Sequence, residues 1–370
     1  MFAALARLLH RKTYSLNYIP EVDGIRFLAI FMVFLHHAFS VFGTIFGSGP
    51  VQRSFTDVLM GNGFKGIHIF FVLSGFILAL PFIKWRESEG QKVSTKSYFL
   101  RRLIRLEPPY ILSLLICVFM QWDPTHGPEI WRHFFAAVFY SHNLIYGRFG
   151  NPNGVGWTLE IEAQFYILAP LIFQVFRLQK GARRLLLVTV AALFCMAQYF
   201  YAPATPSLYL YIPYFLLGAA IADIYADGGL PQLNGGWVLA AAALLYGLTW
   251  YLPILQSKEA NLPFPFIVAA LLFCIFNNNS LRRLFSLQAI TIIGGMCYSI
   301  YLLHYPVLFF VGNITKVLYR GQGFWKNFAV QLPLYAIGVL VICSIYFLLV
   351  EKPFMLARRR KKVLPLLKEN

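Results

Sequence analysis

Long apolar runs recur along the whole chain, and polar residues gather in short segments between them. An apolar run of about 20 residues crosses the hydrocarbon core of a bilayer, roughly 30 Å thick, as one helix. Ten runs approach this length, beginning near Gly24, Gly66, Leu106, Gly156, Leu185, Ser207, Gly236, Pro263, Ala289 and Phe328. The pattern predicts an all-α, polytopic membrane protein of about ten transmembrane helices.

A weaker apolar stretch, residues 131–146, does not fit this series. If it crossed the membrane, every later segment would be inverted. Its polar residues His133, Ser141 and His142 suit a position beside protein or a wet cavity, where irregular backbone is tolerated at membrane depth. We therefore expect an interfacial or re-entrant helix on the outer side.

Composition agrees with a membrane protein. Of the 370 residues, 58% are hydrophobic and 13% are charged, and the mean hydropathy is +0.62. A soluble domain of this length is far more polar. No long linker or convincing repeat divides the chain, so we predict one transmembrane domain over residues 20–353. Residues 1–19 are expected to form a cytoplasmic amphipathic segment, with a frayed basic segment as the alternative, and residues 354–370 a basic cytoplasmic tail.

The net charge of +17 follows the predicted topology. With ten spans and a cytoplasmic N-terminus, 24 of the 32 Lys and Arg residues fall on the cytoplasmic side and eight on the other. This excess is the positive-inside signal, so both termini are expected in the cytoplasm. The basic residues do not form one face or tail with stacking aromatics, which argues against a nucleic-acid partner.

The cysteines all lie in apolar runs, at Cys117, Cys195, Cys274, Cys297 and Cys343. Their number is odd and their spacing is not that of metal ligands. We interpret them as small core residues, with neither a disulfide framework nor a metal site.

Arg26 and His37 stand eleven residues apart in the first apolar run. Eleven residues make about three helical turns, so the two side chains share one face, roughly 16 Å apart along the axis. An ionisable residue in a membrane helix costs about 2.5–3.5 kcal/mol, which favours a functional role. Two structural alternatives stay open: Arg26 reaching the membrane interface, and His37 bonded to a neighbouring helix.

Three arginines lead into the third run from its cytoplasmic end, at Arg101, Arg102 and Arg105. Spacings of three and four residues let them converge on one ligand. Guanidinium groups bind phosphates and stay charged, which suits coenzyme A or a nucleotide. An ordinary positive-inside cluster is the alternative. Pro108 and Pro109 follow, and they predict a kink or break beside the arginines.

The fourth run begins with two carboxylates, Glu160 and Glu162. Two residues apart on a helix, they point to nearly opposite faces and do not form an acid and base pair of the glycosidase type. Glu160 fits a capping role in the first turn. Glu162 lies deeper, with Tyr166 one turn further on the same face. We expect Glu162 to be the functional acid, orienting a histidine, accepting a proton or binding a sugar hydroxyl.

Two more polar clusters lie in apolar runs. The ninth run carries four aromatic polar residues within two turns, Tyr298, Tyr301, His304 and Tyr305, which fit a cavity lining or catalytic groups. In the second run, Ser74 and Gly75 supply small residues for close helix packing. The residues around Ser74 do not match a nucleophile elbow, so we do not expect it to be a nucleophile.

These segments together resemble the membrane-bound acyltransferase family 3. The arginine, ten residues, histidine signature of that family is matched by Arg26 and His37, after its usual aspartate and glycine at Asp23 and Gly24. Three further motifs are matched by Arg102, Arg105, Pro108 and Tyr110, by Trp157, Thr158, Leu159, Glu162, Phe165 and Tyr166, and by the run FFVLSGF from Phe70 to Phe76. The late tyrosine and histidine motif resembles Tyr298 to Pro306. The resemblance covers roughly residues 20–353.

The chain departs from the family at two positions. Many members carry an aspartate where this chain has His68, and a serine where it has Thr158. The first change puts in doubt any role of that acidic position here. We expect no appended extracytoplasmic hydrolase-like domain, so the membrane domain or a partner would handle the acceptor.

The resemblance implies an O-acyltransferase of a bacterial inner membrane. It would move an acyl group, with acetyl preferred, from cytoplasmic acyl-CoA to a sugar hydroxyl of a cell-surface polysaccharide, lipopolysaccharide, exopolysaccharide or glycolipid. Acetyl-CoA would be a co-substrate, and no permanently bound cofactor is expected. His37 would act on the acyl transfer and Arg26 would hold the donor. Coenzyme A would be bound by Arg101, Arg102, Arg105 and Tyr110.

Two mechanisms stay open for His37. It would serve as general base toward the acceptor, oriented by Glu162 or another buried acid, or it would form an acyl-histidine. Seven further residues are expected to line the cavity: Asp23, His68, Ser74, Trp157, Tyr166, Tyr301 and His304. A transporter or flippase of an anionic lipid-linked substrate is the alternative from another class.

Overall fold

The computed structural model describes residues 8–11, 18–47, 55–87, 93–123, 127–147, 152–228, 233, 235–251, 262–318 and 323–355. All regular elements in these ranges are helices, so the prediction of an all-α fold is confirmed. Of the expected N-terminal amphipathic segment only residues 8–11 and 18–19 are described, and of the basic tail only residues 354–355. The division into three segments therefore stays a prediction.

Each of the ten apolar runs contains a helix. These helices are α2 (Pro20–Phe46), α4 (Gly66–Arg86), α5 (Thr95–Met120), α8 (Trp157–Ile172), α9 (Lys180–Phe200), α10 (Leu208–Ala226), α11 (Gly236–Tyr251), α13 (Phe264–Asn277), α16 (Cys297–Thr315) and α17 (Phe324–Tyr346). Shorter elements connect them: α3 (Phe55–Asn62), η1 (Gly63–Lys65), α6 (Gly127–Val138), α7 (His142–Tyr146), η2 (Phe173–Arg177), α14 (Asn279–Phe285), α15 (Gln288–Gly295), η4 (Lys316–Leu318) and the π-helical turn η5 (Phe347–Glu351).

Fewer helices are suited to cross a membrane than the ten predicted. In the described ranges, eight are long and apolar enough, or nine if α13 and α14 form one span bent by 95°. Helix α11 has 16 residues, about 24 Å of helical rise, which is less than the hydrocarbon thickness. The bend follows from Asn278, whose backbone is extended and whose side chain caps α14 by accepting a bond from the amide of Leu281.

The stretch predicted to be re-entrant forms two short helices, α6 and α7. They are joined through Tyr140, whose φ of 53° lies in the left-handed region that bulky residues rarely adopt. With 12 and five residues, neither helix is long enough to cross a membrane. The side of the membrane on which they lie stays a prediction.

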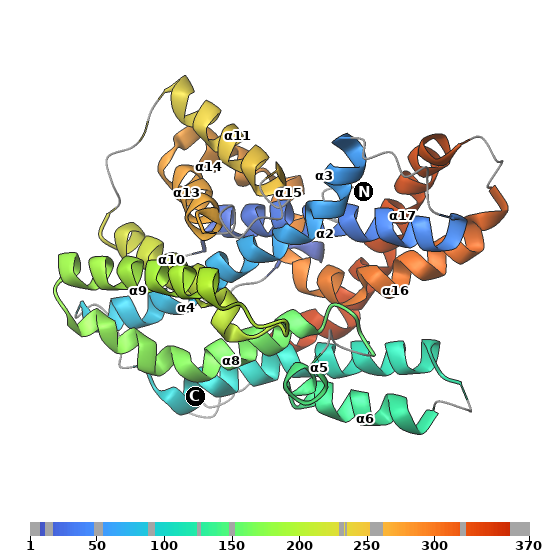
Figure 1. Ribbon diagram of the computed structural model, residues 1–370, viewed down its shortest axis with the longest axis horizontal. Coiled ribbons are helices and arrows are strands. Elements are labelled where there is room, and N and C mark those ends of the chain that lie inside the picture. Colours follow the sequence, from blue (N-terminus) through green and yellow to red (C-terminus); the bar gives the residue numbers. More distant parts are fainter. Residues whose placement is uncertain are drawn as a thin grey trace, which may run out of the picture.

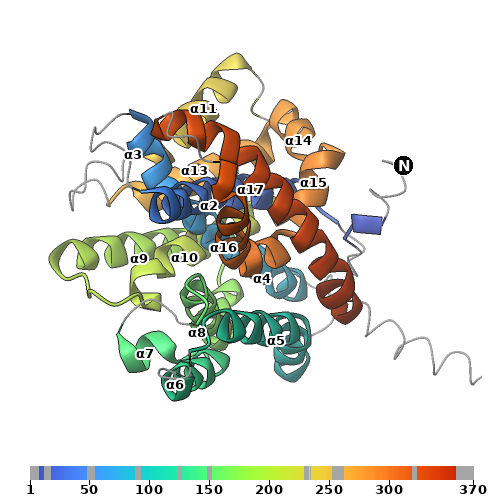
Figure 2. The ribbon, with the colours of Figure 1, turned by 90° about the vertical axis from the view of Figure 1, so that its right-hand side faces the viewer.

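A central set of helices is flanked by two groups. In both views, α5 to α8 lie along one side of the bundle, and α11 and α13 to α15 along the opposite side (Figures 1 and 2). Between them lie α2, α4, α10 and α16. Helix α4 packs along α10, and α2 packs on α4, α15 and α16. Functional side chains from α2, α4, α8 and α16 are thereby turned toward one interior.

Small residues let α4 and α10 approach closely, as predicted for Gly75. A Cβ added at Gly75 would lie 2.0 Å from the carbonyl oxygen of Phe215, and one at Gly218 would lie 2.0 Å from that of Val72. Each glycine therefore faces backbone of the other helix, which has no side chain that can move away. This contact holds the second run against the sixth.

We expect Gly75→Ala to destabilise the protein by about 1–3 kcal/mol, the usual cost of overpacking, because the two helices must separate. Gly247→Ala on α11 is the matched control, since no atom lies within 4 Å of its added Cβ. Thermal unfolding in detergent, followed by size-exclusion chromatography, measures both variants. Equal melting temperatures for the two variants would contradict the packing argument.

The first and last described parts of the chain meet at one end of the bundle. Lys352 donates a hydrogen bond to the carbonyl oxygen of Leu8. The Arg282 guanidinium in α14 pairs with Glu21 at the start of α2, with Nε 2.7 Å from Oε1. Glu351 accepts hydrogen bonds from the amide and the hydroxyl of Ser299 in α16, at 3.1 and 2.6 Å.

Candidate active site

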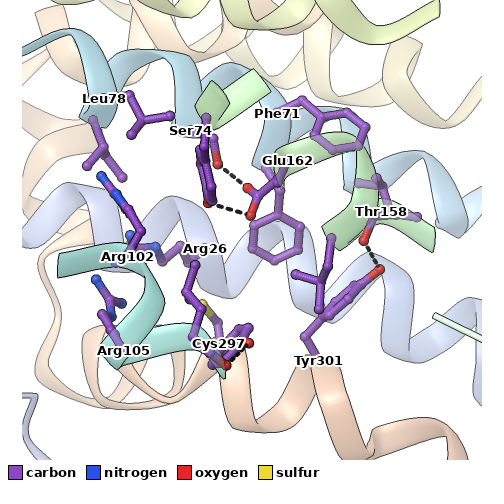
Figure 3. Close-up of a pocket in the computed structure, with 17 residues that line it drawn as sticks. Arg26, Phe71, Ser74, Leu78, Arg102, Arg105, Thr158, Glu162, Cys297 and Tyr301 are labelled. Carbon is purple, nitrogen blue, oxygen red and sulfur yellow. Dashed lines mark hydrogen bonds between the residues drawn. The ribbon is translucent and has the colours of Figure 1, made fainter. Parts of the chain in front are cut away.

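Five helices, α2, α4, α5, α8 and α16, enclose a cavity of about 100 Å³ (Figure 3). Its polar lining consists of Arg26, Ser74, Arg102, Arg105, Thr158, Glu162, Tyr166, Cys297, Tyr298 and Tyr301. Its apolar lining consists of Ile67, Phe70, Phe71, Ile77, Leu78, Leu106 and Leu159. Arg102 and Arg105 lie at one end in Figure 3, Thr158 and Tyr301 at the other, and Glu162 between them.

Arg26 is held in place by Asp23, one turn earlier on α2. Its Nη1 lies 2.6 Å from Oδ1 of Asp23, and the same oxygen lies 2.9 Å from Nη1 of Arg11. The hydroxyl of Tyr18 donates to the other oxygen at 3.0 Å. Burial and the Asp23 carboxylate raise the pKa of Tyr18 well above its usual value, so the phenol stays a donor. Asp23 therefore orients the arginine and, against expectation, does not itself line the cavity.

Arg102 and Arg105 enter the cavity from α5 without a carboxylate partner among the described residues. The Nε atom of Arg105 is buried and has no hydrogen-bond partner within those ranges. The guanidinium of Arg102 lies 5.4 Å from the ring centre of Tyr166. No carboxylate bonds these two cations directly in those ranges, so this end of the cavity is suited to an anion.

Arg101 does not join the other two arginines, although all three were expected to converge. Its side chain is exposed, and its Nη1 donates to the hydroxyl of Ser97 at 2.7 Å. The helix remains continuous through Pro108 and Pro109, so the predicted break is absent from α5. An unbroken helix keeps neighbouring residues about 100° apart, and this rotation turns Arg101 away from the cavity.

Glu162 stands in the middle of the cavity with both oxygens engaged. Ser74 from α4 donates to Oε1, and the hydroxyl of Tyr166 donates to Oε2 at 2.7 Å (Figure 3). The carboxylate was expected to orient His37. In the described residues its oxygens bond to Ser74 and Tyr166 instead. These contacts tie α4 to α8 and place one negative charge between the arginines and the far end.

Glu160 is directed away from this cavity, as its spacing from Glu162 predicts. It is buried, and its Oε2 accepts a hydrogen bond of 2.8 Å from the amide of Asn143 in α7. Glu160 thus anchors the short helix α7 beside α8. The sequence had indicated that Glu160 caps α8 itself.

Thr158 and Tyr301 close the end of the cavity opposite the arginines. Their hydroxyl oxygens lie 2.5 Å apart, and Tyr301 also donates to the carbonyl oxygen of Val155 at 2.8 Å. Threonine and serine both carry a hydroxyl, so the departure at Thr158 keeps the group that makes this bond.

His37 lies just beyond this closed end and does not line the cavity. Its ring centre is 5.1 Å from that of His304, 5.0 Å from that of Tyr305 and 4.9 Å from that of His36. His304 follows Tyr301 by one turn of α16, so His37 is about one helical turn from the cavity lining. His304, expected to line the cavity, is fully buried beside His37 instead.

Three other predicted residues are buried outside the cavity. The hydroxyl of Tyr110 donates to the carbonyl oxygen of Ala137 at 3.3 Å, so it is used in joining α5 to α6. His68 bonds the carbonyl oxygen of Lys65 at 3.1 Å through Nδ1. Trp157 packs 5.6 Å from the ring of Tyr211. The expected cavity lining is therefore met by Ser74, Tyr166 and Tyr301.

Sequence reasoning missed several residues of the site. Cys297, interpreted as a core residue, lines the cavity and is partly exposed there. Arg11 and Glu351 gather near Arg26 from distant parts of the chain, and no local motif marks them. Within the described residues, no group of three or more His, Cys, Asp or Glu side chains could hold a metal ion.

Comparison with known proteins shows what the chain is similar to. Residues 19–348 match the family model of the acyltransferase 3 domain. The chain is 26% identical over 379 residues to the peptidoglycan O-acetyltransferase OatA of Listeria monocytogenes, covering 92% of this chain and 56% of that protein. It is 25% identical over 385 residues to the O-acetyltransferase OatA of Staphylococcus aureus, covering 95% and 58%.

A third relative is the putative peptidoglycan O-acetyltransferase YrhL of Bacillus subtilis, 26% identical over 389 residues, with 93% of this chain and 56% of that protein covered. The chain thus spans little more than half the length of these relatives. No solved structure matches it significantly.

Proposed function

The chain belongs to the acyltransferase 3 family, and from this premise we propose that it is a membrane O-acetyltransferase that uses acetyl-CoA and a glycan acceptor. The main support for the proposal is the composition of the cavity. Three arginines, Arg26, Arg102 and Arg105, share it with the Glu162 carboxylate, and His37 lies one helical turn beyond it.

The arginine end suits the phosphates of coenzyme A. Arg102 and Arg105 have no carboxylate partner in the described ranges, and guanidinium groups form strong charge-assisted bonds to phosphate. Arg26 is about 16 Å from His37 along α2, by helical rise. An extended pantetheine arm would then carry the thioester past Glu162 toward Tyr301 and His37.

His37 would act either on the acceptor hydroxyl, as a general base, or on the thioester carbonyl, as a nucleophile. As general base, it removes the proton of the acceptor hydroxyl while the oxygen bonds to the acetyl carbon. The carbon–sulfur bond then breaks, and the coenzyme A thiolate takes the proton from His37. As nucleophile, its ring nitrogen would instead hold the acetyl group before the hydroxyl attacks. Both routes yield an acetyl ester and free coenzyme A.

The donor would enter from the cytoplasm. The excess of Lys and Arg, 24 to eight in the ten-span topology, supports a cytoplasmic position for the end of the bundle that carries Arg26 and Arg105. The contact of Lys352 with Leu8 supports both termini lying on that side. Helix α11 is too short to span the membrane by itself. If α11 and α13 together enter and leave the membrane on one side, the number of spans stays even and both termini still lie on the same side.

The acceptor would be a sugar hydroxyl of the cell envelope. Two of the named relatives are called peptidoglycan O-acetyltransferases, and the family resemblance also fits lipopolysaccharide, exopolysaccharide or glycolipid. The bacterial origin of these relatives supports a position in a bacterial plasma membrane.

The test is acetyl transfer by the purified full chain in lipid nanodiscs. We expect radiolabelled acetyl-CoA to yield an alkali-labile acetyl ester on one of three offered glycans, peptidoglycan fragments, lipopolysaccharide or exopolysaccharide, with equal release of coenzyme A. Heat-denatured protein is the control. Movement of a lipid-linked glycan across proteoliposomes, with no acetyl ester formed, would instead support the transporter alternative.

A further inference from the structure

His304 is a buried histidine whose protonation pattern is set by its own helix. Its side chain is fully buried, and Nδ1 lies 2.9 Å from the carbonyl oxygens of both Ile300 and Tyr301. Carbonyl oxygens only accept hydrogen bonds, so Nδ1 must carry the proton. In the neutral ring, Nε2 then holds a lone pair, and no group in the described residues bonds to it.

The ring of His37 is placed to become the missing partner. The centres of the two rings are 5.1 Å apart, with an interplanar angle of 49°. The same chain offers a reference, because Nδ1 of His133 lies 2.9 Å from Nε2 of His142 while those ring centres are 5.0 Å apart and tilted by 41°. This separation is therefore compatible with an N–H···N bond when the two rings are suitably turned.

His36 is a weaker candidate for this role. Its ring is 4.9 Å away and its Nδ1 bonds the carbonyl oxygen of Met60 at 3.2 Å, so its Nε2 is also an acceptor. His36 is only partly buried, however, whereas the Nε2 of His304 is buried and has no partner in the described residues. The oxygens of Glu162 accept from Ser74 and Tyr166. A buried acceptor without a partner is destabilising, which indicates that Nε2 of His304 is satisfied in a working state of the protein.

We propose that His304 is the positioning residue of His37, a role that rests on the proposed function. Nε2 of His304 accepts the N–H of His37, which sets the tautomer of His37 and leaves its other nitrogen with a lone pair for the reaction. When that nitrogen takes the proton of the acceptor hydroxyl, the resulting imidazolium is stabilised by His304. The proton then passes to the sulfur of the departing coenzyme A. His304 would thus set the tautomer of His37 and stabilise its imidazolium, as a carboxylate does for the histidine of the serine protease triad.

The test compares two substitutions of His304, one that keeps only its hydrogen-bond donor and one that keeps only its acceptor. His304→Asn keeps a donor near the position of Nδ1, as Asn313 on the same helix shows by donating to the carbonyl oxygen of Phe309 at 2.9 Å. It removes the acceptor at Nε2. His304→Gln places an amide oxygen near Nε2, which can accept the bond from His37. His36→Asn is the matched control, since that ring also contacts His37.

We expect His304→Asn to lower kcat for acetyl transfer by about 10²-fold, the lower range for acid and base groups, with KM for acetyl-CoA within threefold of wild type. His304→Gln should recover about tenfold of that loss, and His36→Asn should stay within threefold of wild type. All melting temperatures should agree within a few degrees. A purely structural role predicts losses that follow the melting temperature, which would overturn the proposal.

Two outcomes separate this inference from the proposed function. If the wild type transfers acetyl groups and His304→Asn keeps its kcat within threefold, the positioning role is wrong and the acetyltransferase proposal stands. If the wild type transfers none, the proposed function fails first. If His304→Asn does not fold, a His304→Gln variant that folds but has no more than about 1% of the wild-type kcat also overturns the inference, because the retained acceptor should preserve part of the rate.

Discussion

Replacing His37 with alanine is expected to lower kcat for acetyl transfer by about 10³-fold or more, while the protein still folds and inserts. General acid and base groups contribute about 10²–10⁴-fold, and loss of a nucleophile costs more. The side chain is partly buried against His304 and Tyr305, so its truncation removes ring contacts but no hydrogen bond within the described residues. Coenzyme A release and ester formation by the purified variant measure the effect.

The control for this variant is His36→Ala, one position earlier on α2. Its ring packs against Phe64 at 5.4 Å and contacts His37 from the other side. We expect this variant to keep activity within about tenfold of wild type. Activity in His37→Ala comparable to that in His36→Ala would remove His37 from the mechanism.

The same assay separates the two roles of His37. Without acceptor, an acyl-histidine route predicts a rapid release of one coenzyme A per protein molecule, which His37→Ala should abolish. Direct transfer predicts no such burst, because the thioester is stable until a hydroxyl arrives.

Charge reversal at Arg102 or Arg105 is expected to raise KM for acetyl-CoA by about 10- to 100-fold. Each guanidinium forms charge-assisted bonds worth about 1.5–3 kcal/mol, and 1.4 kcal/mol corresponds to a tenfold change in affinity. Reversal also adds repulsion between the new carboxylate and the phosphates. We expect kcat to change little, since these residues lie at the end of the cavity away from Thr158 and Tyr301 (Figure 3).

Arg101→Glu provides the control, because it changes the net charge equally at a neighbouring position of α5. The side chain of Arg101 is exposed and bonds Ser97, outside the cavity. KM for this variant should stay within about threefold of wild type. Equal increases for all three variants would mean that the cluster acts only through the surface potential of this end of the bundle.

Helices and their positions in the chain could be predicted from local patterns. Apolar runs near 20 residues become helices because a backbone in lipid must satisfy its own hydrogen bonds. The same regularity places Arg26 and His37 on one face of α2 and Arg102 and Arg105 on one face of α5. Span number was less predictable: α11 is too short, and Asn278 bends the run shared by α13 and α14 by 95°.

The partners of the polar side chains were decided by tertiary structure. Ser74 and Glu162 are 88 residues apart, and their bond depends on how α4 and α8 are rotated against each other. The same holds for His304 beside His37, and for Asp23, which orients Arg26 without lining the cavity.

By itself, the sequence determined an all-helical membrane protein, the chemistry available on each helix and the family to which the chain belongs. Only the tertiary structure decided that Arg101 lies outside the cavity, that Glu162 bonds to Ser74 and Tyr166, and that a second histidine, His304, lies beside His37. The reason is physical, because periodicity along one helix fixes which residues share a face, whereas the neighbour that this face meets is set by packing between helices.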